Sequence, residues 1–158
     1  MVDGSIIHIL ANRSTCPSSL DGTATLHGWL IGTLPFGSKY GPLSPGELVV
    51  RFAGSEVAEV SGSNPALCAD FYRALAAFPE LQHVSESAVG MSRSVAATAP
   101  GHPAGHLWHE RHLGFQIGLG ARLAQTPHPD VPTVGHHLDL VFRHGQLRAA
   151  DGSELLTW

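Results

Sequence analysis

The 158-residue sequence has few cysteines, little charge and no long apolar run, and each shortage excludes a class of protein. The two cysteines, Cys16 and Cys68, lie far apart without the spacing of a zinc ligand set, so we expect two free thiols. No apolar run is long enough to cross a bilayer, and the start of the chain lacks the basic and apolar regions of a signal peptide. We therefore expect a cytoplasmic protein with no membrane partner.

Charged residues make up only 14% of the chain, and basic residues are the minority among them. Nine Lys and Arg stand against 13 Asp and Glu, which gives a net charge of −4 with neutral histidines. No cationic surplus is available to neutralise a phosphate backbone, so we expect no nucleic-acid partner. A hydrophobic content of 43% instead predicts one folded domain over residues 1–158.

Glycine and proline are abundant, with 18 and 11 residues, and they indicate many turns between short strands. We expect an α+β, strand-dominated domain of short mixed or antiparallel strands. Alternating or short apolar segments predict strands at 5–10, 23–31, 47–52, 56–60, 81–91, 113–119, 137–143, 147–150 and 154–158. We interpret the Gly- and Pro-rich segments 33–45, 92–105 and 124–135 as loops.

One firm helix is predicted at about 64–78. Ser63 or Asn64 can cap its N-terminus, Pro65 suits its first turn, and Pro79 ends it. Apolar residues recur at three- and four-residue steps, which is typical of a helix that packs on a core; they are Leu67, Phe71, Ala74, Leu75 and Phe78.

The pair His137 and Asp139 is the first candidate for chemistry. Residues two apart on a strand point to the same side, so the imidazole and the carboxylate project together. Such a pair suits one metal ion, or a catalytic His–Asp arrangement in which Asp139 orients His137 as a general base. A salt-bridged or surface pair is the simpler interpretation, because alternating polar residues are ordinary on a half-buried strand.

A second histidine group, His106, His109 and His112, repeats every three residues. On a helix these side chains would share a face and could bind zinc or nickel, but a solvated turn is the simpler interpretation. Their spacing matches no zinc-protease motif. The glycines at 118 and 120 indicate a close backbone approach or a bulge rather than a phosphate-binding loop.

The order of several short motifs resembles the C-terminal half of the thermophilic metallo-aminopeptidases, the aminopeptidase T-like family. GFQIGLG at 114–120, HLDLV at 137–141 and LRAADG at 147–152 resemble the end of that family's sequence. Upstream, ESAVG at 86–90, the stretch 47–62 and LDGTA at 20–24 resemble its earlier segments. The resemblance implies the fold of that C-terminal domain, here without the family's large N-terminal domain.

The resemblance also implies a set of vestigial metal ligands. Glu86, His137 and Asp139 fall on ligand positions of the family's two-metal site. Gln116 stands where the family has a histidine, Leu123 where it has a tyrosine, and no carboxylate falls at 12–14. The remaining ligands are too few for a two-metal centre. We therefore expect no resident metal, with a single divalent metal on the three remaining ligands as the alternative.

Small stand-alone proteins of this kind are similar to the peptide-binding proteins of crocagin-type ribosomal peptide biosynthesis. This resemblance implies an accessory protein that holds a precursor peptide for tailoring enzymes of the same pathway, and a homodimer. It favours binding over catalysis. Two alternatives are a metal-dependent hydrolase or oxygenase on a reduced mononuclear site, and a metal-free acid–base cyclase acting through His137.

Overall fold

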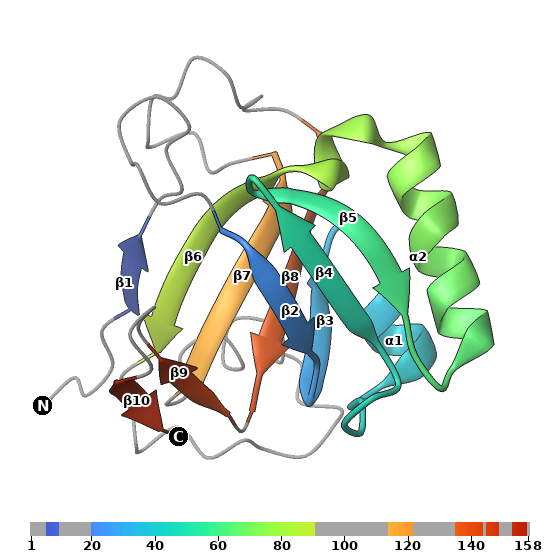
Figure 1. Cartoon of the computed structure of the whole chain (residues 1–158). Helices are drawn as coiled ribbons and strands as arrows, with labels where there is room; N and C mark the ends of the chain where they lie inside the picture. The colour runs from blue at the N-terminus through green and yellow to red at the C-terminus, as the bar shows by residue number, and fades with distance from the viewer. Residues whose placement is uncertain are drawn as a thin grey trace, which may run out of the picture.

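Strands dominate the computed structural model, which describes residues 6–9, 20–90, 114–121, 135–143, 145–148 and 153–157 (Figure 1). The strands are β1 (Ile6–Ile9), β2 (Gly22–Thr25), β3 (Gly28–Gly32), β4 (Val49–Ala53), β5 (Glu56–Ser61), β6 (Val84–Gly90), β7 (Gly114–Gly120), β8 (His137–Phe142), β9 (Gln146–Arg148) and β10 (Glu154–Thr157). The helices are α1 (Phe36–Tyr40), α2 (Pro65–Ala77) and the 3-10 turn η1 (Pro79–Gln82).

The described strands form three antiparallel sheets. The largest has the order β1-β6-β7-β8-β3, the second has the order β2-β4-β5, and β9 pairs with β10. Figure 1 shows β2, β4 and β5 crossing in front of the five-stranded sheet, with α2 along one side. The predicted α+β, strand-dominated fold with one firm helix is confirmed.

The main core lies between these two sheets and α2. Its buried side chains come from one face of the five-stranded sheet, from the facing side of the three-stranded sheet and from α2. They include Leu30, Ile117, Leu119, Leu138, Leu140, Val50, Phe52, Val60, Leu67, Phe71 and Leu75. The opposite face of the five-stranded sheet carries a separate buried cluster of Trp29, Ile31 and Val141. Asp139 and His137 lie on the same face of the sheet as this smaller cluster, because they alternate with the core residues Leu138 and Leu140 along β8.

Helix α2 begins and ends where the sequence predicts. The side chain of Asn64 accepts a hydrogen bond from the Leu67 amide at 3.1 Å, and Pro65 is the first helical residue. Leu67, Phe71 and Leu75 are buried on one face, as their spacing predicts.

Two predicted segments were wrong. The expected strand 23–31 is broken into β2 and β3, which belong to different sheets. Gly28 permits the change, because a Cβ there would lie 1.9 Å from the Val141 carbonyl oxygen. The expected loop 33–45 contains α1, whose Phe36 ring is buried 5.8 Å from the Phe71 ring. Among the described residues, no helix is long and apolar enough to cross a membrane.

Candidate metal centre

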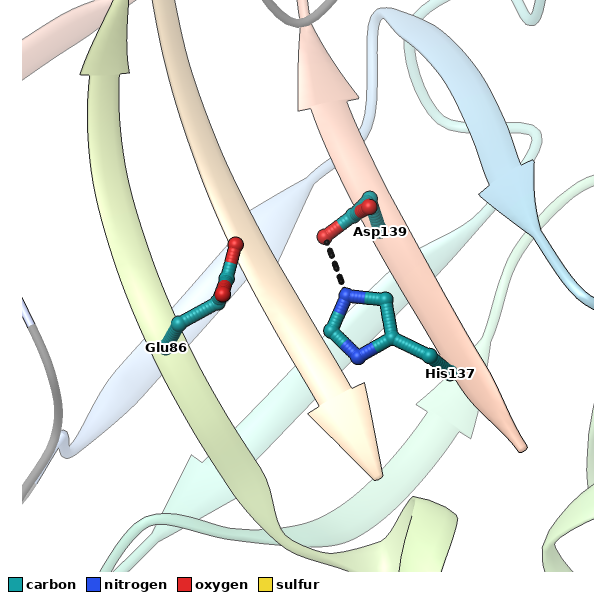
Figure 2. A group of neighbouring side chains, drawn as sticks. All are labelled: Glu86, His137 and Asp139. Carbon is teal, nitrogen blue, oxygen red and sulfur yellow. Dashed lines mark hydrogen bonds and ion pairs between the residues drawn. The ribbon is translucent and has the colours of Figure 1, made fainter. Parts of the chain in front are cut away.

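Three adjacent strands bring the candidate residues close together on one face of the sheet. Glu86 on β6 pairs with Gly118 on β7, and Gly118 pairs with Asp139 on β8. His137 lies two residues before Asp139 and projects to the same side, as the alternation of strand side chains predicts. Figure 2 shows Glu86 facing His137 and Asp139 across β7. These residues lie on the sheet face opposite the main core.

An irregularity in β6 aims Glu86 at this face. The register shifts between Val84 and Glu86. Val84 pairs with Leu119, and Glu86 pairs with the directly adjacent residue of β7, Gly118. In a regular strand, two residues at i and i+2 would share a face. Ser85 is the extra residue, which lets Val84 enter the core while Glu86 points to the other side.

Gly118 leaves the space that the cluster occupies. A Cβ at this position would lie 2.4 Å from Glu86 Cγ, and 3.0 Å from both Asp139 Oδ1 and His137 Cε1. The contact with Glu86 Cγ is shorter than any real Cβ contact and the other two are tight, so a side chain at 118 would require these groups to shift. At Gly118 it is side chains that approach closely; the close backbone approach that the sequence predicted for this segment lies at Gly120, where a Cβ would be 2.2 Å from the His136 carbonyl oxygen.

Both ring nitrogens of His137 have partners. Nδ1 lies 2.6 Å from the carbonyl oxygen of Ala121, and Nε2 lies 3.1 Å from Asp139 Oδ1. A carbonyl only accepts, so Nδ1 must carry a proton and donate it. Nε2 therefore either donates a second proton to Asp139 or, when deprotonated, offers its lone pair to a cation.

The surroundings of His137 favour its charged form. Burial lowers the pKa of His137, but the hydrogen bond to Asp139, the charges of Asp139 and Glu86 and the Ala121 carbonyl outweigh burial and raise this pKa to about 9. In metal-free protein the ring is then an imidazolium at neutral pH. The ring can then donate a proton, whereas the alternative role of a general base requires the neutral ring. A strongly shifted pKa beside buried carboxylates is also typical of functional sites.

Glu86 has a second buried neighbour on the same face. Gln116, two residues before Gly118 on β7, donates from Nε2 to Glu86 Oε1 at 3.3 Å. Only 3% of Gln116 and 4% of Glu86 is exposed. Because a buried carboxylate needs a compensating charge or hydrogen bonds, the amide meets part of that need.

The geometry of Glu86, His137 and Asp139 fits one metal ion. One ligand atom from each residue lies within 4.8 Å of the other two. Two carboxylates balance the charge of a divalent cation, and three protein ligands leave coordination positions unfilled, as catalytic metal sites require. The group could therefore hold a single metal ion.

The structure brings together the ligands that the sequence singled out and places Gln116 beside them. The region 12–14, Leu123, and His106, His109 and His112 lie outside the described residues. Sequence reasoning missed Ser85 and treated Gln116 only as a lost ligand. The register shift at Ser85 could not be predicted from the sequence. A strand with a bulge and a regular strand can have the same pattern of apolar and polar residues.

Comparison with known proteins gives little beyond the fold. No protein-family model matches the chain, and no curated protein matches it. The structure is similar to that of 2,5-dihydroxypyridine dioxygenase from Pseudomonas putida KT2440, with a TM-score of 0.58 and 17% sequence identity. The similarity covers 88% of this chain and 39% of the dioxygenase chain, so this chain spans well under half of that protein. At this identity the likeness shows a shared fold.

Proposed function

We propose that this domain is a metal-dependent enzyme that binds one divalent ion through Glu86, His137 and Asp139. The observation that carries the proposal is the convergence of three ligand atoms from two strands, all within 4.8 Å of one another. Gly118 supports the proposal, because it lies on β7 between the ligands and has no side chain to occupy the space where they meet.

A divalent ion at such a centre supplies a Lewis acid that polarises a bound oxygen atom. The chain's own residues perform the remaining tasks. Ala121 fixes the orientation of the His137 ring through Nδ1, which leaves Nε2 directed at Asp139, where it could serve as a metal ligand. The low exposure of Glu86 and Asp139 keeps bulk water away and strengthens their electrostatic interactions.

The reaction class is either hydrolytic or oxidative. The likeness to a dioxygenase is a reason to assay oxygen consumption first, with small aromatic substrates and then with peptides. Two carboxylates and one histidine also suit Mn²⁺ and Fe²⁺, because carboxylate oxygens are hard ligands.

Metal titration of untagged protein tests the proposal. After treatment with a chelator, the protein should bind one equivalent of Mn²⁺ or Fe²⁺ by calorimetry. His137→Ala should weaken this binding by more than about 100-fold, because even loss of a supporting residue costs 10–100-fold.

A matched control is needed because the chain has 11 histidines, several of which can bind metal adventitiously. His83→Ala removes a half-exposed histidine that pairs with Glu56 instead of the cluster. It should leave the stoichiometry and affinity unchanged. Equal effects of His83→Ala and His137→Ala, or no binding by the parent protein, would refute the metal centre.

The predicted binding of a ribosomal precursor peptide stays a prediction, as do the tailoring partners and the homodimer. Calorimetric titration with candidate peptides tests it directly. Peptide binding that persists after the metal is removed would favour the accessory role. A metal-free cyclase would instead keep its activity in chelator and lose it in His137→Gln.

A further inference from the structure

His137 is the first residue of β8, so this proposed ligand lies at the end of a strand. Strand ends open more easily than strand interiors unless other groups hold them. The His137 ring is oriented by the Ala121 carbonyl, and the N–H of Ala121 donates to the His136 carbonyl oxygen at 2.8 Å. The position of the ligand therefore depends on what holds His136.

A carboxylate from η1 holds His136. Glu80 Oε1 accepts a hydrogen bond from the His136 backbone N–H at 3.0 Å and lies 3.2 Å from ring Nδ1 of the same residue. The hydrogen bond from the backbone N–H is the main reason that the pKa of Glu80 is lowered, so the carboxylate is charged at neutral pH. Hydrogen bonds to a charged acceptor are stronger than those between neutral groups.

The neighbours of Glu80 fit this contact. Gly135 has a φ of +146°, and a Cβ there would lie 2.9 Å from Glu80 Oε1, so a larger residue would crowd the carboxylate. The Phe78 ring lies against the His136 ring, with 3.6 Å between their centroids. The end of α2 and the turn η1 therefore hold the residue that directly precedes His137.

We propose that Glu80 is a positioning residue, which holds His136 and thereby sets the position of the metal ligand His137. This inference rests on the proposed function. Glu80 acts through the backbone of His136 and through Ala121, which orients the His137 ring. A ligand that is already in place loses less freedom when the ion binds, so the contact raises metal affinity.

Two substitutions at Glu80 test the positioning role. Glu80→Ala removes the acceptor, whereas Glu80→Gln keeps an oxygen that can accept from His136. In calorimetric titration with Mn²⁺, Glu80→Ala should bind about 10-fold more weakly than the parent, and Glu80→Gln should stay within about threefold of it. Unchanged affinity in Glu80→Ala, or an equal loss in both variants, would overturn the proposal.

Asn64→Ala is the matched control for a general loss of stability. It removes the cap at the other end of α2, the helix that leads into η1. It should lower the unfolding temperature and leave Mn²⁺ affinity unchanged. If Asn64→Ala weakened Mn²⁺ binding as much as Glu80→Ala does, the effect would be structural and the inference would fail.

A second readout does not need the metal. By nuclear magnetic resonance of metal-free protein, the proton on His137 Nδ1 should exchange with water several-fold faster in Glu80→Ala than in the parent, and Glu80→Gln should restore the slow exchange. Equal exchange rates in the parent and Glu80→Ala would overturn the positioning role. Absence of Mn²⁺ binding by the parent protein would instead refute the proposed function, so the two failures are distinguishable.

Discussion

At the scale of single residues, His137 connects the chemistry of the site with the stability of the fold. Its imidazolium lies beside Asp139 and near Glu86, so a proton balances part of the buried negative charge in metal-free protein. A metal ion bound at Nε2 would take over that charge. Protons and metal ions therefore compete for the same atom, as they do at most histidine ligands.

This competition predicts a stability that depends on pH. The pKa of His137 is raised from 6.5 to about 9 in the folded state, so its stabilising effect is complete below pH 6.5 and is lost as pH rises through 9. We expect metal-free protein to lose up to about 3 kcal/mol of unfolding free energy over this range from this residue. Urea unfolding at several pH values measures it.

The control for this measurement is His137→Gln, which cannot titrate. The difference in unfolding free energy between parent and variant should shrink from pH 6.5 to pH 9.5. A difference that stays constant with pH would contradict the charged imidazolium.

At the scale of elements, the site depends on how three strands fit together. The H-x-D pattern on β8 could be predicted from the sequence, because alternation alone puts His137 and Asp139 on one side. The orientation of Glu86 could not, since it follows from the register shift at Ser85. The break between β2 and β3 was also missed, because Leu26 and His27 do not interrupt the pattern of a strand at 23–31.

Gly118→Ala should disrupt the site from the middle strand. The added methyl group would press on Glu86, Asp139 and His137 at once. We expect a loss of about 1–3 kcal/mol of stability from overpacking and a clear loss of Mn²⁺ affinity. Thermal unfolding and calorimetry of the same preparation measure both quantities.

Ile117→Val is the matched control on the same strand. Ile117 faces the main core, so the change should cost about 0.5–1.5 kcal/mol and leave Mn²⁺ affinity intact. If Gly118→Ala bound Mn²⁺ as tightly as Ile117→Val does, the cluster would not be the metal site.

At the scale of the whole molecule, the two faces of the five-stranded sheet differ in composition. One face of the five-stranded sheet packs on the three-stranded sheet and α2, while the other face carries Glu86, Gln116, His137 and Asp139. The apolar periodicity of α2 and the strand alternation predict the first face well. The second face contains buried polar groups, which contradict hydrophobic patterning and become interpretable only once their mutual distances are known.

The most direct test of the metal centre is anomalous diffraction from crystals grown with Mn²⁺ and without an affinity tag. Our account predicts one anomalous peak per chain within bonding distance of Glu86, His137 and Asp139, with Gln116 still hydrogen-bonded to Glu86. Peaks confined to other histidines, with His137 Nε2 still hydrogen-bonded to Asp139, would contradict it.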